Sequence, residues 1–273
     1  MHGDHLKQFC CAALLIVSVS GANAACEFAL QGEGRVAQII DARTLRLDDG
    51  RDVRLAGIET PTDDAARGRD ALATLIEGRE VTLHGADDRP DRYGHQIAFV
   101  AVKGTGASVQ LELVARGEMA ASPTITDKPC LAALFAAEET AREAGRGIWG
   151  SSAALKNAER ADDISARMGR FAVIEGTALS ARLAGTAFYV NFGRRWTRDF
   201  AVTISKRMMP SFAAAGIDLN ALTGKKIRVR GWIERRGGPR IEASHVGQIE
   251  IVAAAEAAGS NNGAGTLARD EGK

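Results

Sequence analysis

From Gly34 onward, hydrophobic and polar residues alternate in short runs, the pattern of strands with one buried face. The first half of the chain holds five such runs, at Arg35–Ile40, Thr44–Asp48, Asp52–Ile58, Glu80–Gly85 and Gln96–Val102. Asp49-Gly50, between the second run and the third, is a turn signal typical of a hairpin. This part of the chain is therefore predicted to be mainly β.

Three other segments have hydrophobic residues at helical spacing, at Asp63–Glu77, Val109–Arg116 and Pro129–Ala144. A glycine follows each of them at position 78, 117 or 145, and glycine commonly ends a helix. A helix between the third and fourth of five strands favours a small OB-type barrel. The predicted class is thus mainly β with α (α+β), built on an OB-fold-like five-stranded barrel with helices.

The second half of the chain predicts another small, OB-like and β-rich domain over residues 169–252. Its expected strands are Phe171–Gly176, Thr186–Phe192, Phe200–Ser205, Lys225–Glu234 and Arg240–His245, with a short helical segment at Arg207–Ala215. Residues 151–168 are rich in Ala, Ser and charge, and predict a linker with some helical content. Residues 253–273 are rich in Ala, Gly and Asn, and predict a disordered tail.

The N-terminus has the pattern of a secretory signal peptide over residues 1–24, which predicts a periplasmic or secreted protein. Lys7 precedes an apolar run from Phe9 to Val19, and Ala22-Asn23-Ala24 forms an A-x-A cleavage site. A membrane anchor and a lipoprotein attached at Cys26 are the alternatives. The run is about half of the roughly 20 residues that a spanning helix needs. No other segment is apolar enough to span a membrane, so stable membrane insertion is not expected.

Removal of residues 1–24 would leave two cysteines, Cys26 and Cys130. A single pair in an exported protein predicts a disulfide, and two free buried thiols are the alternative. No CxxC or Cys/His zinc pattern is present.

Charge is distributed unevenly, although the whole chain carries a formal net charge of only +1. Residues 26–160 hold 17 Lys and Arg against 22 Asp and Glu, a net charge of −5. Residues 165–252 hold 15 Lys and Arg against 6 Asp and Glu, a net charge of +9. This asymmetry predicts that the second half contacts an anionic partner.

Four short motifs resemble those of the staphylococcal nuclease (thermonuclease) family, over about residues 33–150. They are Asp41-Ala42-Arg43-Thr44, the segment Val53 to Thr62, the loop Asp91-Arg92-Tyr93-Gly94-His95, and Gly147-Ile148-Trp149. The resemblance implies the family's OB-type barrel and its chemistry. In that chemistry a calcium ion polarises a phosphodiester, a glutamate assists the attacking water, and two arginines clamp the phosphate.

Several chemical groups of that frame are replaced. Arg43 stands where the family has a calcium-binding aspartate, and Glu59 stands where it has the second one. The carboxylates of Asp41 and Glu59 and the carbonyl of Thr60 are the remaining candidate metal ligands. These replacements predict a weak calcium site or none, because an arginine repels a dication.

The candidate catalytic residues are Arg54, His95 and Asp63. Arg54 matches the first phosphate-binding arginine of the family, and His95 replaces the second. Thr62 falls where the general-base glutamate belongs, so Asp63 or Asp64 would have to act as the base. The alternative role of these two aspartates is to cap the following helix.

Nucleic acid, or another polyanion such as lipopolysaccharide or phospholipid headgroups, is the expected partner, and the sequence indicates nothing about protein partners. Basic residues interleave with aromatic ones in the second half, a typical arrangement for binding single strands. The candidate nucleic-acid-binding residues are Arg92, Tyr93, Arg194, Arg195, Arg228 and Arg230. The chain is therefore predicted to be an exported thermonuclease-family protein that binds nucleic acid with a degenerate catalytic site. The alternative is an active metal-dependent nuclease with a rebuilt site.

Overall fold

The computed structural model describes residues 26, 28–61, 64–106 and 108–252. The predicted signal peptide (1–24), the predicted tail (253–273), Thr62 and Asp63 lie outside the described residues. None of the described helices is long and apolar enough to cross a membrane.

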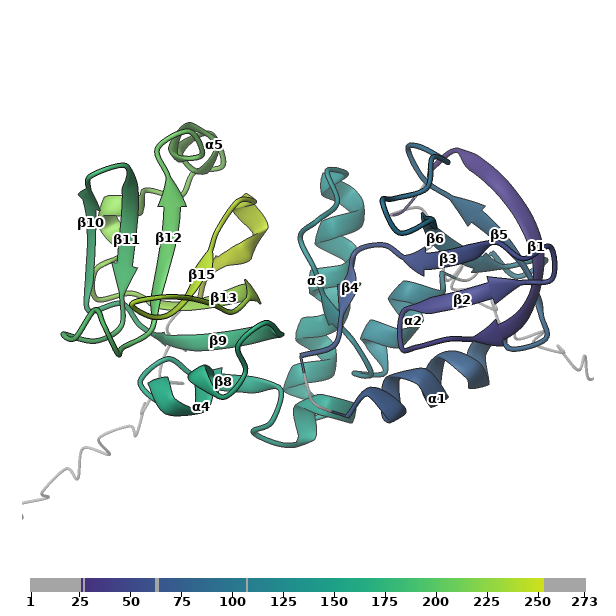
Figure 1. Cartoon of the computed structure of the whole chain (residues 1–273), viewed down its shortest axis with the longest axis horizontal. Coiled ribbons are helices and arrows are strands. Elements are labelled where there is room, and N and C mark those ends of the chain that lie inside the picture. The colour runs from purple at the N-terminus through teal and green to yellow at the C-terminus, as the bar shows by residue number, and fades with distance from the viewer. Residues whose placement is uncertain (1–25, 27, 62–63, 107, 253–273) are drawn as a thin grey trace, which may run out of the picture.

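The first part of the chain forms a closed five-stranded barrel with the strand order β1-β2-β3-β6-β5 (Figure 1). Its strands are β1 (Leu30–Ile39), β2 (Thr44–Leu47), β3 (Asp52–Leu55), β5 (Glu80–His84) and β6 (His95–Val102). Every neighbouring pair is antiparallel except β3 and β6, which run parallel. The predicted five-stranded barrel is confirmed.

The third predicted strand, Asp52–Ile58, is wrong in extent. It is divided into β3 and a separate strand β4 (Ile58–Glu59), because Gly57 adopts a positive φ of 72° between them. A Cβ at Gly57 would lie 3.1 Å from Leu134 Cδ1, so the chain turns tightly against a helix here. This turn takes Glu59 out of the barrel and pairs it with Ala120 of β7 (Ala120–Ala121).

Three helices pack on the barrel, namely α1 (Ala65–Ile76), α2 (Val109–Ala115) and α3 (Lys128–Glu143). Each is capped by the side chain that precedes it. Asp64 accepts a hydrogen bond from Arg67 N, Ser108 from Leu111 N, and Asp127 from Cys130 N. Asp64 therefore has the structural role that sequence reasoning gave as the alternative to catalysis.

The second part of the chain forms two β-sheets. One has the order β10-β11-β12-β15-β14 and the other β16-β13-β9-β8. The strands are β8 (Leu155–Asn157), β9 (Phe171–Thr177), β10 (Ser180–Ala184), β11 (Ala187–Asn191), β12 (Ala201–Ser205), β13 (Lys226–Trp232), β14 (Glu234–Arg236), β15 (Gly238–Glu242) and β16 (Ile249–Ile251). The short helix α5 (Met209–Ala214) lies between β12 and β13.

The segment 151–168, predicted as a linker, is packed against the second part. Leu155–Asn157 forms β8, which pairs in parallel with β9, and Ala161–Ser165 forms the short helix α4. Ala154 and Ile164 are buried.

The two parts meet along α3, which stands between them in Figure 1. A shared apolar cluster crosses the boundary and contains Ala120, Ala141, Ile148, Trp149, Ala154, Phe171 and Val173. Across the same boundary runs an ion pair in which Arg230 Nη1 of β13 lies 2.8 Å from Glu138 Oε2 of α3, both side chains being 1% exposed. Arg167 adds a second bond, from its Nη2 to the carbonyl of Pro61 at 2.8 Å. Buried charge of this kind is tolerated only when it is paired, so it fixes how the two parts are oriented.

A disulfide joins Cys26, which precedes β1, to Cys130 in the first turn of α3. It closes a loop with a sequence separation of 104 residues, so the predicted pairing is present. In the same region the ring of Phe28 stacks on Phe99 of β6 with centroids 4.8 Å apart.

We predict that reduction of the Cys26–Cys130 disulfide lowers the free energy of unfolding by roughly 2–5 kcal/mol, since it frees a long loop in the unfolded chain. Denaturant titration with and without reductant measures this change. The Cys26→Ser/Cys130→Ser variant should show the lower stability in both conditions. Equal stability of oxidised wild type and this variant would contradict the prediction.

Candidate functional site

The candidate site lies on the outer face of the barrel, where β2, β3 and β6 run side by side. Register pairs Arg54 with Thr44 on one side and with Ile97 on the other, and pairs Asp52 with His95. Because directly opposed residues point to the same face, Arg54 and His95 lie on one surface. Val53 and Leu55 point into the core and leave Arg54 half-buried on the outside.

Arg43 lies over this surface and forms an ion pair with Glu59. Its Nη1 donates to Glu59 Oε1 and, at 3.2 Å, to the carbonyl of Ile58. The Arg43 side chain is 13% exposed and that of Glu59 is 8% exposed. The arginine therefore occupies the side of Glu59 that a cation would have to approach.

Burial dominates the electrostatics of this pair. It raises the pKa of the Glu59 carboxyl, and the attraction of Arg43 and Arg54 offsets only part of that rise. Burial likewise lowers the pKa of the Arg43 guanidinium, and the positive charge of Arg54 lowers it further. Both pKa shifts indicate that the free-energy cost of removing the two charges from water exceeds the gain from their mutual attraction.

The remaining candidate metal ligands are not arranged as a cation site. Asp41 is exposed, and its Oδ1 accepts a hydrogen bond from the backbone N of Arg43 at 2.7 Å, so it closes the turn. Thr60 follows β4, and a Cβ at Gly68 of α1 would lie 3.6 Å from its Cγ2. This close approach of α1 holds Thr60 next to the turn that carries Arg43.

Calcium does not fit this set of donors. A calcium ion takes six to eight oxygen ligands, most of them carboxylate or carbonyl. The described residues contain no group of three or more His, Cys, Asp or Glu side chains that could hold a metal ion. A dication about 4 Å from Arg43 would meet a repulsion on the order of 8 kcal/mol at an effective dielectric of 20. The Arg43–Glu59 ion pair thus replaces the metal ion that the sequence motifs imply.

His95 is held by its own loop and not by Arg54. Asp91 accepts hydrogen bonds from the backbone N of Tyr93 at 2.8 Å and of His95 at 3.0 Å, and lies 3.4 Å from His95 Nδ1. These bonds, the His95 backbone N–H first, lower the pKa of the Asp91 carboxyl. The same loop presents Tyr93 to solvent, with the Arg92 guanidinium 4.6 Å from the centre of its ring.

The strand that carries Glu59 is connected to the second part of the chain through its partner strand. Its partner β7 contains Ala121, whose N donates to Glu138 Oε2 at 2.7 Å and whose carbonyl accepts from Arg230 Nη1 at 3.0 Å. The ion pair between the two parts and the ion pair in the candidate site are therefore connected through one two-residue strand.

The structure separates the four arginines of the second part that were predicted to bind nucleic acid. Arg228 and Arg230 are buried, with Arg228 paired to Glu175 at 2.7 Å and to Glu250 at 2.7 Å. They present no guanidinium to a ligand, because strands β9 and β16 and helix α3 supply carboxylates that cover them. These two residues therefore belong to the ion pairs that hold the second part together and against α3. Arg194 and Arg195 are exposed, in the loop between β11 and β12.

The exposed arginines meet a tryptophan. Trp196, 74% exposed, packs on Gly237 of the turn between β14 and β15, and its carbonyl accepts from Gly238 N at 3.1 Å. A Cβ at Gly237 would lie 2.9 Å from the indole ring, so glycine permits this contact. We call the resulting patch the arginine–tryptophan surface, and it consists of Arg194, Arg195, Trp196, Arg235 and Arg236.

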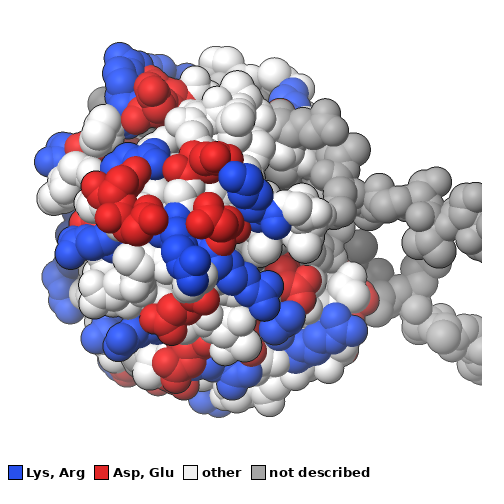
Figure 2. All heavy atoms as spheres, turned by 90° about the vertical axis from the view of Figure 1, so that its right-hand side faces the viewer, with Lys and Arg blue, Asp and Glu red and all other residues white. Residues whose placement is uncertain are grey.

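Within the part of the chain that the structure describes, the guanidinium groups of this surface form no ion pair with a carboxylate, whereas the neighbouring Arg198 and Arg240 do. The barrel differs. Its end view in Figure 2 shows basic and acidic side chains interleaved. Pairs on the barrel include Arg46 with Asp52 at 2.6 Å, Arg51 with Asp49 at 2.7 Å and Lys103 with Glu33 at 2.9 Å. The arginine–tryptophan surface is thus a cluster of guanidinium groups that have no carboxylate partner among the described residues.

A family model for staphylococcal nuclease homologues matches residues 52–151. The chain therefore contains a domain of the staphylococcal nuclease homologue family, and this domain indicates a function related to nucleic acid. The matched residues begin at β3, while β1 and β2 complete the same barrel. No curated protein matches the chain.

Sequence reasoning identified each member of the candidate site but missed that Arg43 and Glu59 bind each other. A signal was present in the combination of the two replacements. A positive charge at one former calcium position and a longer acid at the other are complementary. Sequence reasoning also placed Trp196, Arg235 and Arg236 in a region rich in basic and aromatic residues. It did not predict that they form one surface, because that surface depends on contact between the β11–β12 loop and the β14–β15 turn, which are distant in sequence.

We predict that calcium does not change the melting temperature of the wild type, because no site prefers the ion in the folded state. Arg43→Asp should melt at a lower temperature than wild type without calcium, since it places a second carboxylate beside buried Glu59. Calcium should then raise its melting temperature by about 5 °C or more. Thermal scans in chelator, calcium and magnesium measure this, and a rise in the wild type with calcium would contradict it.

We predict that Arg43→Met lowers the free energy of unfolding by about 3–5 kcal/mol at pH 8, because Glu59 is left buried without a partner. A raised folded-state pKa of an acid contributes stability below the unfolded pKa, and that stability is lost as pH rises through the folded pKa. The deficit of Arg43→Met relative to wild type should therefore shrink at pH 5.

Denaturant titrations at both pH values provide the measurement. The matched control is Arg43→Met/Glu59→Leu, which removes both charges and should recover wild-type stability to within about 1.5 kcal/mol. A deficit of Arg43→Met that is the same at pH 5 and pH 8 would show that Glu59 does not depend on Arg43.

Proposed function

We propose that this protein binds single-stranded nucleic acid and does not hydrolyse it in a calcium-dependent reaction. The observation that carries the proposal is the buried Arg43–Glu59 ion pair, which stands where the motifs imply a metal ion. Without the ion, nothing in the described site polarises a phosphoryl group as the family chemistry requires. Affinity for phosphate is a separate property, and Arg54 keeps a guanidinium suited to it.

The second part of the chain supports the binding role, because its strands pair in the same order as those of the barrel. β10 and β12 flank β11, β12 pairs in parallel with β15, α5 lies between β12 and β13, and β13 pairs with β9. We propose that it is a second OB-like unit. OB folds bind oligonucleotides on the face of the second and third strands and on the adjoining loops.

The arginine–tryptophan surface includes one of the connections through which OB folds bind, that between the fourth and fifth strands. It combines the β11–β12 loop with the β14–β15 turn, which correspond to the connections between the second and third strands and between the fourth and fifth. Free guanidinium groups attract phosphates, and an exposed indole stacks on an unpaired base of any kind. This composition favours single strands over duplexes, whose bases are already stacked.

Export is part of the proposal. Residues 1–24 have the composition of a signal peptide, and the disulfide at Cys26 and Cys130 is typical of a protein that folds in an oxidising compartment. We propose a periplasmic or secreted location, where the nucleic acid would be extracellular in origin.

An active nuclease is the second candidate, and one observation favours it. Among the described residues Arg54 forms no ion pair, so it could clamp a phosphate beside Glu59. Asp63 lies outside the described residues and would have to act as the base. A digestion assay on single-stranded DNA, duplex DNA and RNA, with calcium, other divalent ions or chelator, tests this candidate; ion-dependent cleavage that disappears in Arg54→Ala would support it.

We predict that a labelled single strand binds the mature protein and that the affinity falls steeply with salt. Removal of Arg194, Arg195, Arg235 or Arg236 should reduce the slope of log K against log salt by about 0.7 for each phosphate that is no longer neutralised. Trp196→Ala should weaken binding by about 1–3 kcal/mol, since the stacking platform is removed. Fluorescence anisotropy over a salt series measures both effects.

Arg46→Ala is the matched control, because Arg46 is exposed on the barrel and paired with Asp52. It should leave the affinity for the strand unchanged. A protein that binds no strand at low salt, or one whose binding is unaffected by all five substitutions on the arginine–tryptophan surface, would overturn the proposed function.

A further inference from the structure

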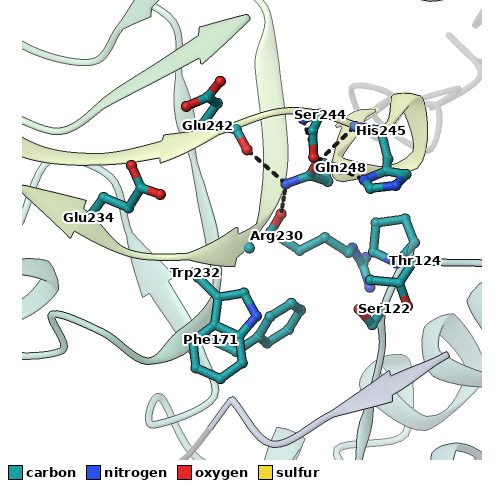
Figure 3. A pocket seen from close by; sticks show the side chains of 12 residues that line it. Ser122, Thr124, Phe171, Arg230, Trp232, Glu234, Glu242, Ser244, His245 and Gln248 are labelled. Carbon is teal, nitrogen blue, oxygen red and sulfur yellow. Dashed lines mark hydrogen bonds between the residues drawn. The ribbon is translucent and has the colours of Figure 1, made fainter. Parts of the chain in front are cut away.

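A pocket of about 270 Å³ opens between the two parts of the chain (Figure 3). Residues of the loop after β7 form one wall, and strands β9, β13, β14 and β15 with the following turn form the others. The lining includes Phe171, Arg230, Trp232, Glu234, Glu242 and Gln248. The volume lies just below the range of drug-sized sites, so the pocket suits one ring system.

The floor of the pocket is aromatic. Phe171 and Trp232 meet edge to face, with ring centroids 6.3 Å apart and planes inclined at 74°. Phe171 is buried, whereas Trp232 is 50% exposed and lies at the pocket in Figure 3. A half-exposed indole beside a buried ring is a rigid platform on which a flat group can stack.

The rim of the pocket carries hydrogen-bond acceptors. The carboxylates of Glu234 and Glu242 both lie near Arg240 Nη2, at 3.4 and 3.7 Å, and both side chains remain about half exposed. Each carboxylate can accept more hydrogen bonds than this one arginine provides. The pocket therefore favours a ligand that donates N–H groups from the edge of a ring.

Two further observations describe the walls. Gln248 Nε2 donates to the carbonyls of Arg230 and Glu242 at 3.1 and 3.2 Å, and its Oε1 accepts from Ser244 N at 2.7 Å, so this wall is rigidly built. Arg230, although paired through Nη1 and Nη2, has a buried Nε–H for which the described residues supply no acceptor.

The charges around the pocket favour entry of the base of a nucleotide over entry of its phosphate. Two carboxylates at the rim repel a phosphate, while Arg235 and Arg236 lie on the same hairpin just outside the pocket. Trp232 and Arg236 are four residues apart, so at most about 13 Å separates them along an extended strand. That distance is on the order of four stacked nucleotides at roughly 3.4 Å each. A strand held on the arginine–tryptophan surface can thus reach the pocket with a base.

We infer that the pocket between the two parts receives one unpaired base whose edge carries an exocyclic amino group, with guanine as the best fit. This inference rests on the proposed function and adds base selectivity to it. The base stacks on Trp232 and donates its N–H groups to Glu234 or Glu242, while phosphates of neighbouring nucleotides lie with Arg235 and Arg236. Thymine and uracil, which lack the amino group, bind less well.

The test compares two labelled strands by fluorescence anisotropy. One is an oligothymidine of about ten nucleotides, and the other has a single internal guanine in place of one thymine. The wild type should bind the guanine strand about tenfold more tightly, as expected for one good base contact. Trp232→Ala should abolish the difference and leave the affinity for oligothymidine nearly unchanged, whereas Trp232→Phe should retain much of the difference.

Glu234→Gln and Glu242→Gln separate the carboxylates from the stacking, and at least one of them should reduce the preference for guanine severalfold. Trp196→Ala is the matched control, and it should weaken binding of both strands equally. Binding of both strands with equal affinity, or a preference that persists in Trp232→Ala, would overturn this inference alone. Failure of the wild type to bind either strand would overturn the proposed function as well.

Discussion

A guanidinium that is taken out of water must be matched by a carboxylate, and three arginines of this chain show the constraint clearly. Arg43 is matched by Glu59, Arg228 by Glu175 and Glu250, and Arg230 by Glu138 and Glu250. The first pair closes the place of a metal ion on the barrel. The third joins the second part of the chain to α3. The same rule therefore applies both to the candidate site on the barrel and to the boundary between the two parts.

These pairs are connected through the backbone. Glu59 lies in β4, β4 pairs with β7, and Ala121 of β7 is held by both Glu138 and Arg230. The boundary between the two parts and the candidate site are thus linked by one two-residue strand, and the pocket at Trp232 lies on the same boundary. The staphylococcal nuclease homologue domain is consequently not an isolated barrel in this chain. In the further inference we draw, the loop after β7 forms one wall of the base pocket, and the second part forms the others.

The sequence was sufficient for most of the fold because the barrel strands bury one face and so alternate clearly. It failed where that signal is weak. Strand β10 has no fully buried residue, and β8 and β14 are only three residues long, so none of them shows a period. Gly57 divides a predicted strand for a steric reason that lies in α3, remote in sequence. Periodicity carries information about a residue's own face and none about which element packs on it.

For the candidate site, too, the sequence predicted the positions of the residues but not their contacts. Motif spacing located Arg43, Arg54, Glu59 and His95 on one region of the barrel, but whether Arg43 repels a ligand or neutralises Glu59 depends on distance. In the second part, composition alone did not distinguish arginines that could bind a ligand from arginines that are buried in ion pairs. Burial separates Arg228 and Arg230, which hold the structure together, from Arg194 and Arg195, which face solvent. Alternation along β13 could not make that distinction, because five consecutive residues of that strand are buried.

The most direct test of the central claim is the affinity of the mature protein for a single labelled strand, measured in chelator and again with calcium, followed by recovery of the strand. If the Arg43–Glu59 pair has replaced the metal ion, the dissociation constant is the same in both conditions and the strand is recovered at full length. A strand that binds more tightly in calcium and is recovered shortened would show that the barrel still holds the ion and cleaves.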